Sequence, residues 1–254
     1  MRTTITTSPA TGEKESDTEM ADNKLDVRVY PIDEPKGNTK AFASIGIDDM
    51  LAIRGIRVVE GEKGMFVVMP QSKDKENNFH DIAFPLTADL RKDMTATVIE
   101  EYKRVAELPP EQRGYEAPDM SGANGIRAQD VRLDIRVYPL DEPKGSTKAF
   151  ASVGIDDLAA IRGVRVVEGE KGLFVTMPQS KDSGGEYHDI AFPINGDLRK
   201  EISKSVLDEY KAAERSAERK PTLAEGLRDG AAKAAEQAAM PREAAAKSRA
   251  GVLE

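Results

Sequence analysis

Hydrophobic and polar residues alternate in several short segments from Leu25 onward, a period of two that is typical of half-buried β-strands. Turn residues such as Pro31 and the tetrad Gly61-Glu62-Lys63-Gly64 separate these segments, and the tetrad should close a hairpin. Short strands that follow one another without helices indicate an antiparallel sheet. The expected strands are residues 25–30, 40–47, 53–59 and 65–69.

The pattern changes after Pro70. Residues 71–78 are polar and are expected to form a surface hairpin loop, and residues 79–84 are expected to form a last short strand that Pro85 ends. From Leu90 the period becomes helical, because apolar residues recur every four positions, and Thr87 is a favoured N-cap residue. The segment is therefore predicted to be an α+β unit, an antiparallel sheet with one amphipathic C-terminal helix.

This whole pattern occurs twice. Residues 25–107 match residues 133–215 without a gap, at a constant offset of 108 residues. The best-preserved stretch, RGIRVVEGEKGMFVVMPQSK at 54–73, returns as RGVRVVEGEKGLFVTMPQSK at 162–181. A repeat of this length is a small domain copied in tandem. Residues 25–107 are called module 1 below, and residues 133–215 are called module 2.

Three further segments lack such a pattern. The leader, residues 1–24, is rich in Thr, Ser, Glu and Asp, so it is expected to be disordered. Residues 108–132 contain several Pro and Gly and form a linker whose reach of roughly 25–30 Å lets the two modules associate side by side. The Ala-rich tail, residues 216–254, has a capping box at Thr222 and Glu225, and we expect a frayed helix or one that forms on a protein partner.

Composition narrows the class of protein. The chain has no Cys, so disulfides and thiolate metal sites are excluded, and a cytoplasmic location is the simplest expectation. No apolar run is long enough for a signal peptide or a membrane span, so no membrane contact is expected. The net charge is −8, and each module carries 12 Lys and Arg against 15 Asp and Glu. Any nucleic-acid site must therefore be a local basic patch on an acidic body.

Basic pairs stand in the first turn of each predicted helix, where cations oppose the helix dipole. They are Arg91 and Lys92 in module 1 and Arg199 and Lys200 in module 2. One interpretation is contact with phosphate, which the helix amides would also attract. The other is local pairing with the preceding aspartate, Asp89 or its copy.

Lysines flank the polar loop that precedes the last strand. Lys73, Lys75 and Lys181 have flexible ammonium groups that would reach a phosphate, although Lys beside Asp is also ordinary in a solvated loop. Arginines alternate with branched apolar residues along the third strand. For these, a solvated face or a charged rim where the modules meet is favoured over base recognition, and they are Arg54, Arg57, Arg162 and Arg165.

The two histidines, His80 and His188, each precede an Asp, an arrangement that general-base catalysis uses. One His per module supplies too few ligands for zinc, and the sequence shows no nucleophile, P-loop or GxGxxG pattern. A hydrogen-bonded histidine at a strand end is the favoured interpretation. We therefore expect a non-enzymatic protein with no catalytic residue, no cofactor and no metal.

An ordered series of motifs carries a family resemblance. These are VRV near the start of each module, IRVVEGEKGMFVVMPQSK, the pattern F/Y-x-D-I-A-x-P at 79–85 and 187–193, and D-L-R-K before the helix. Together they resemble the SpoVG family, known as septation or stage V sporulation protein G. The resemblance implies small bacterial homodimers with an antiparallel sheet and a C-terminal helix, several of which bind DNA or RNA as site-selective regulators. Two copies in one chain are then expected to form an intrachain pseudo-dimer.

The modules depart from the family at two points. Asp74 and Asp182 stand where the family commonly has Arg after Ser-Lys, and His80 and His188 stand where it often has Arg. Both changes lower the positive charge. The leading hypothesis is regulatory DNA or RNA binding, linked to septation or sporulation, through a two-fold surface made of the Lys73 loop, the Arg91-Lys92 helix start and their copies. The alternative is a structural or adaptor protein of cell division that acts through protein contacts.

Overall fold

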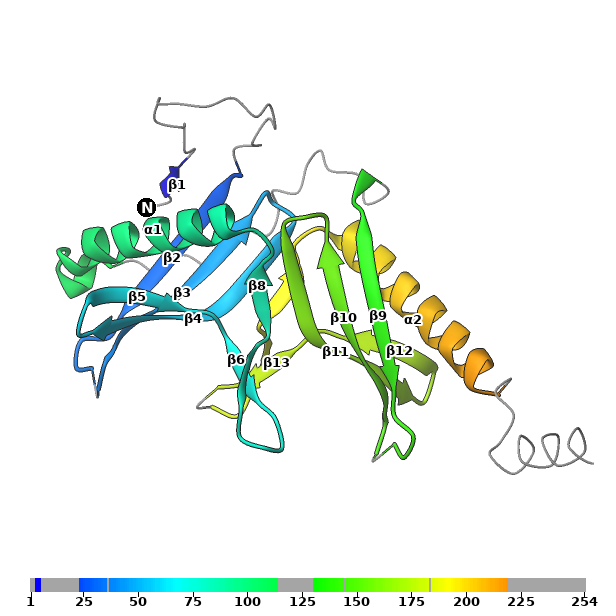
Figure 1. The fold of residues 1–254 in the computed structure, drawn as a ribbon. Helices are drawn as coiled ribbons and strands as arrows, with labels where there is room; N and C mark the ends of the chain where they lie inside the picture. The colour runs from blue at the N-terminus through cyan, green and yellow to red at the C-terminus, as the bar shows by residue number, and fades with distance from the viewer. Residues whose placement is uncertain are drawn as a thin grey trace, which may run out of the picture. The chain divides into compact units, whose positions relative to one another are not determined.

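The computed structural model describes residues 3–5, 23–35, 37–113, 130–143, 145–182 and 184–218 (Figure 1). The chain divides into two compact units, residues 1–211 and 212–254. The first contains nearly all of both modules. Of the second, the structure describes residues 212–218, which belong to the last helix.

Module 1 is built on an antiparallel meander in which each strand pairs with the next. Apolar residues that alternate along these strands are buried on one face; along the middle strand, for example, Ala41, Ala43 and Ile45 are at most 2% exposed. Two further strands pair with the meander at its edges. In chain order the strands are β1 (Thr3–Ile5), β2 (Leu25–Pro31), β3 (Thr39–Ile47), β4 (Leu51–Gly61) and β5 (Gly64–Val68).

Module 2 repeats the meander and its hairpin with the same spacing. Its strands are β9 (Leu133–Pro139), β10 (Thr147–Ile155), β11 (Ala159–Gly169) and β12 (Gly172–Thr176). The four strands predicted from the period of two are therefore confirmed in both modules, with ends that differ by a few residues.

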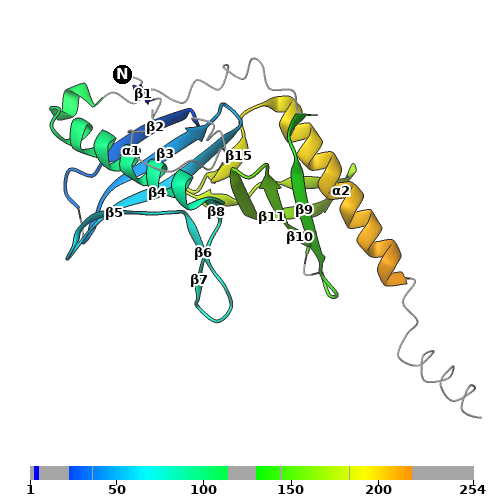
Figure 2. The same cartoon turned by 45° about the horizontal axis from the view of Figure 1, so that its top comes forward.

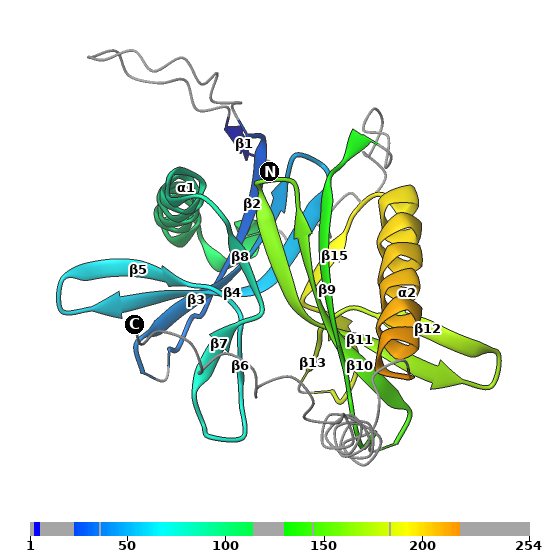
Figure 3. The same cartoon turned by 45° about the vertical axis from the view of Figure 1, so that its right-hand side comes forward.

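One helix follows each sheet, as predicted. Helix α1 (Ala88–Ala106) starts at Thr87, whose Oγ1 accepts a hydrogen bond from the amide of Leu90 at 3.2 Å. Helix α2 (Gly196–Glu218) starts at Asn195, whose Oδ1 accepts from the amide of Asp197 at 2.8 Å. Figure 1 shows α1 running across the sheet of module 1, and Figure 3 shows the same helix along its axis. The buried apolar residues of the two helices are Leu90, Met94, Val98, Val105, Leu198, Ile202, Val206 and Tyr210.

The segment after Pro70 differs from its prediction. The expected loop contains a strand, β6 (Gln71–Lys73), which pairs with β7 (Phe79–Asp81) in a hairpin of its own. The prediction of a single strand at 79–84 is wrong, because β7 ends before Ile82. The chain then continues as β8 (Ala83–Pro85), which belongs to a different sheet. Module 2 does the same with β13 (Gln179–Lys181), β14 (Tyr187–Asp189) and β15 (Ala191–Pro193).

The two modules exchange these last strands. Strand β8 of module 1 pairs with β11 of module 2, and β15 of module 2 pairs with β4 of module 1 (Figure 2). The backbone amide of Arg162 donates to the carbonyl of Ile82, and that of Arg54 donates to the carbonyl of Ile190, both at 2.7 Å. The exchange is thus reciprocal, and each module completes the other's sheet.

A β-bulge at Gly55 divides β4 into two parts with different neighbours. Ala43 pairs with Ile56 and Ile45 pairs with Ile53, so the residues between them form a bulge in β4. Gly55 has a φ of 75°, a region that residues with a Cβ rarely adopt. On one side of the bulge β4 pairs with β15, and on the other side it pairs with β5.

A single hydrophobic core contains residues of both modules. Ile53 and Ile161, which pair with the exchanged strands, are fully buried, as are their partners Ala191 and Ala83. The expected α+β pseudo-dimer is therefore confirmed. In the part of the chain that the structure describes, no helix is long and apolar enough to span a membrane.

The flanking segments are described only in part. The leader was not expected to contain a strand, yet Thr3–Ile5 form β1 on the edge of β2. In the linker, residues 110–112 form a short 3-10 helix, and α2 runs past Arg215 to Glu218. The rest of the leader, residues 114–129 of the linker and the expected tail helix lie outside the described residues.

Candidate nucleic-acid interface

The β6–β7 and β13–β14 hairpins, called the hairpin arms below, carry the loop lysines. Lys73 stands opposite Phe79 in the first arm, and its Nζ lies 4.8 Å from the centroid of the Phe79 ring. Lys181 stands opposite Tyr187 in the second arm at a corresponding distance of 5.7 Å. Lys75, nearer the tip of the first arm, is exposed and makes no ion pair with a described residue.

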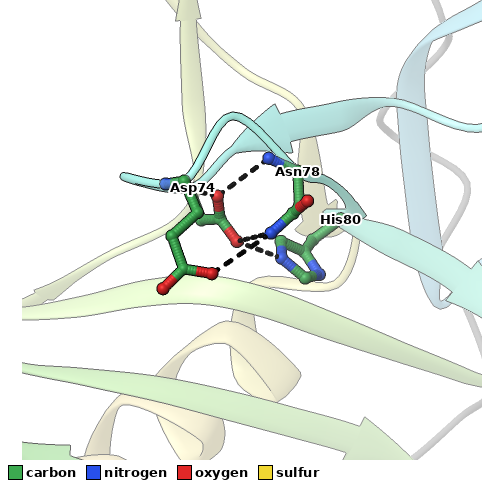
Figure 4. Close-up of polar contacts among 4 residues, drawn as sticks. Asp74, Asn78 and His80 are labelled. Atoms are coloured by element: carbon green, nitrogen blue, oxygen red, sulfur yellow. Dashed lines mark hydrogen bonds and ion pairs between the residues drawn. The ribbon is translucent and has the colours of Figure 1, made fainter.

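The turn of the first arm is held together by one carboxylate. Asp74 Oδ1 accepts hydrogen bonds from the backbone amides of Glu76 at 2.8 Å and Asn78 at 2.9 Å, and its Oδ2 lies 2.8 Å from Nε2 of His80 (Figure 4). These contacts, chiefly the one with His80, lower the pKa of Asp74 to about 2. Asp74 is therefore ionised at neutral pH and fixes the turn between Lys73 and Phe79.

The second arm has the same arrangement. Asp182 accepts from the amide of Glu186 at 2.8 Å, and its Oδ2 lies 2.8 Å from Nε2 of His188, a contact that lowers the pKa of Asp182. Each histidine is thus hydrogen-bonded, but to an aspartate six residues earlier rather than to the adjacent one. In both arms the Asp–His pair organises the loop.

One cluster offers several ligand atoms for a metal. The carboxylates of Asp182 and Glu186 and a ring nitrogen of His188 lie within 4.8 Å of one another. The sequence argument against a metal considered only the number of histidines, and it did not include these two carboxylates, which the turn brings together. In module 1 Asn78 takes the place of Glu186, and in both arms the histidine already contacts an aspartate. The absence of a metal remains a prediction.

The base of each arm is connected to the start of the following helix. Gln71 donates to Asp81 Oδ1 at 2.9 Å, and Asp81 Oδ2 lies 3.9 Å from Nη2 of Arg91. In module 2 Gln179 donates to Asp189 Oδ1 at the same 2.9 Å, and the arginine contact is closer, because Arg199 donates to Asp189 Oδ2 at 3.0 Å. The loop lysines and the helix-start arginines therefore belong to adjoining parts of one surface.

Local pairing of a helix-start lysine with the preceding aspartate is found in module 2 only. Lys200 pairs with Asp197 at 3.0 Å, as that alternative predicts. Arg91 and Arg199 instead pair with the aspartates at the base of the arms, Asp81 and Asp189. Lys92 is exposed and makes no ion pair with a described residue. Exposed ion pairs contribute only about 0–1 kcal/mol, so a phosphate group can compete for these cations.

The strand exchange adds an arginine from the opposite module to each surface. Arg54 of module 1 stacks on Phe192 of module 2, with its Cζ 4.8 Å from the ring centroid, and Cζ of Arg199 lies 5.8 Å from the same centroid. Arg162 stacks in the same way on Phe84 of module 1 at 4.6 Å. The charged rim expected where the modules meet is therefore found at Arg54 and Arg162, and Arg54 shares its ring with the helix-start Arg199.

We group these residues into two composite surfaces, in the second of which Arg199 and Arg54 share the ring of Phe192. The first consists of Lys73, Phe79, Phe84, Arg91 and Lys92 from module 1 with Arg162 from module 2. The second consists of Lys181, Tyr187, Phe192, Arg199 and Lys200 from module 2 with Arg54 from module 1. The aromatic members were not among the residues predicted from the sequence. Phe79 and Tyr187 could have been found, because they occupy the same position of both copies in an otherwise polar segment.

Comparison with known proteins agrees with the duplicated architecture. The SpoVG family model matches twice, at residues 23–104 and 131–212. Similar proteins named septation protein SpoVG include those of Lachnospira eligens, which is 46% identical over 81 residues, and Myxococcus xanthus, which is 42% identical over 82 residues. Each alignment covers 32% of this chain, and it covers 91% and 81% of the respective relative. The chain therefore belongs to the SpoVG family and carries two copies of the family's domain.

Proposed function

We propose that this protein is a regulatory nucleic-acid-binding protein, linked to septation or sporulation, that contacts DNA or RNA through the two composite surfaces. The observation that carries the proposal is the grouping of cations at the exchanged strands. Arg54 and Arg199 come from different modules and lie against one ring, Phe192. Bringing two guanidinium groups together suits a polyanion better than an isolated surface charge does.

The support has three parts. The cations of both modules recur at equivalent positions, which suits a ligand with a repeating phosphate backbone. These cations group near the exchanged strands β8 and β15, although each module as a whole is acidic. The link to cell division rests on the relatives, which are named septation proteins.

Binding of labelled oligonucleotides, followed by fluorescence anisotropy over a range of salt concentrations, tests the proposal. Each phosphate contact contributes about 0.9 to the log–log salt slope for duplex DNA and about 0.7 for a single strand. Replacing Arg91, Lys92, Arg199 and Lys200 together by Ala should lower the slope by about 3 to 4 and weaken binding strongly. The proposal fails if no oligonucleotide binds at about 50 mM salt, or if this variant binds as the unmodified chain does.

A matched pair of variants separates a local site from a general charge effect. Lys92→Ala with Lys200→Ala removes one exposed lysine per module from the composite surfaces. Lys63→Ala with Lys171→Ala removes one exposed lysine per module from the β4–β5 and β11–β12 turns. Both double variants change the net charge equally. Only the first should weaken binding, and equal losses would indicate an unspecific field.

A second candidate function, an adaptor that acts through protein contacts, is favoured by exposed aromatic residues on the sheets. Phe42 and its copy Phe150 are 46% and 43% exposed, in the same position of β3 and β10. Aromatic residues are enriched at protein interfaces. The adaptor predicts that replacing both by Ser changes septum placement in cells that depend on this protein, while oligonucleotide affinity stays the same. The nucleic-acid proposal predicts that the change at the helix starts alters both.

A further inference from the structure

Phe79 and Tyr187 are the most exposed large apolar side chains among the described residues, at 60% and 65%. They occupy equivalent positions on the two hairpin arms. The chain is poor in aromatic residues, and a large aromatic side chain normally contributes to a core. A ring that both copies hold in solvent at the same place is therefore available for contact with another molecule.

The surroundings of the rings indicate the chemistry of that molecule. The ammonium groups of Lys73 and Lys181 lie 4.8 Å and 5.7 Å from the respective ring centroids. At the base of each arm is a helix-start arginine. Each ammonium group lies over one face of its ring, so a nucleotide base would stack on the opposite face while its phosphate meets the cation.

The hydrogen bonds of the first arm also fix the backbone around Phe79. Asp74 fixes the turn through two backbone amides and His80, and the pairing of Lys73 with Phe79 fixes the register of the two short strands. Because the backbone that carries the ring is preorganised, less conformational entropy is lost when the arm binds a ligand. The Asp–His pair thus helps to hold the arm that carries the ring.

We propose that Phe79 and Tyr187 are stacking platforms for unpaired bases, so that the composite surfaces bind single-stranded nucleic acid in preference to a duplex. This inference rests on the proposed function and specifies its ligand. In a duplex the base faces are covered by their neighbours, and exposing them costs unstacking energy. In a single strand the faces are open, and stacking on an aromatic side chain tolerates any base sequence.

The absence of Trp from the chain allows a direct test. Phe79→Trp and Tyr187→Trp each introduce a single reporter, and Phe174→Trp, on β12, serves as a control outside the arms. The full-length variants are titrated with single-stranded oligothymidine and with its duplex with oligoadenosine. The single strand should quench the two arm reporters but leave the control unchanged. The duplex should quench the arm reporters much less.

Removal of the rings gives the second readout. Phe79→Ala with Tyr187→Ala should lower single-strand affinity by roughly 5- to 150-fold for each ring that is engaged, while duplex affinity stays the same. The ring-preserving exchange, Phe79→Tyr with Tyr187→Phe, should bind as the unmodified chain does. Circular dichroism checks that all variants are folded.

The outcomes separate this inference from the proposed function. If neither oligonucleotide binds, the proposed function fails and the inference fails with it. If both bind and the Ala variant matches the unmodified chain, the proposed function stands and the stacking platforms are refuted. If the arm reporters respond to protein concentration instead of oligonucleotide, the rings pack against a second copy of the chain, and the inference is overturned.

Discussion

Ile53 lies between a strand of its own module and a strand of the other, so replacing it by Ala tests whether the modules unfold together. Its register partners are Ile45 on β3 and Ala191 on β15, and its side chain is fully buried. The change removes about three methyl-sized groups, each worth about 0.8 kcal/mol of transfer free energy. With the cavity that remains, the free energy of unfolding should fall by about 3–4 kcal/mol.

The assay is urea unfolding of the full chain, with one reporter in each module. Phe66→Trp reports on the β4–β5 hairpin and Phe174→Trp on the β11–β12 hairpin, and both rings are about half exposed. Because the core is continuous, Ile53→Ala should shift the midpoint of both reporters equally. Ile161→Ala, the equivalent change in module 2, should have the same effect on both.

A different result would refute the shared core. If Ile53→Ala shifts only the reporter in module 1, and the module 2 reporter keeps its midpoint, the modules unfold as independent domains. The exchanged strands would then contribute little to stability, and the composite surfaces would lose their structural basis.

Two further predictions concern the bulge and the loop. Gly55→Ala should destabilise the chain by about 1–2 kcal/mol because of the positive φ, whereas Gly46→Ala, whose Cβ would make only ordinary contacts, should be neutral or slightly stabilising in the same denaturation assay. In carboxyl NMR titrations Asp74 should titrate at about 2, and His80→Gln should raise that pKa towards 3.8 while His188→Gln leaves it unchanged. Because the folded-state pKa is depressed, the stabilisation from ionised Asp74 is complete above its ordinary pKa and is lost as the pH falls from about 3.8 through about 2; an unchanged pKa in His80→Gln would contradict the assigned cause.

The period of two predicted strands well where one face is buried. In β3 the alternation of Ala41, Ala43 and Ile45 with more exposed residues is the signal itself. The hairpin arms gave no such signal because β6 is exposed along its whole length and β7 nearly so. Their strands are held by pairing and by the Asp74 turn rather than by a buried face.

The strand exchange could not be predicted from local sequence patterns, because such patterns do not identify the partner strand. The segment Ala83–Pro85 is apolar, which indicates burial but not which sheet it joins. For the same reason the sequence does not show that Arg54 and Arg199 come together at Phe192. The sequence predicted the loop lysines and the basic residues of the helix starts as candidates, whereas it favoured a solvated face or a charged rim for Arg54 and Arg162. The grouping of all these residues required the fold.

A designed disulfide tests the exchange of strands within one chain most directly, since the sequence contains no cysteine. Phe84 and Ala160 are register partners across β8 and β11. Cross-strand partners have Cα atoms about 4.5–5.5 Å apart, within the range that a disulfide spans. Oxidised Phe84→Cys with Ala160→Cys should be a monomer whose digest contains one peptide pair linked between these positions. Free thiols, or a disulfide-linked dimer, would contradict the intrachain exchange on which both composite surfaces depend.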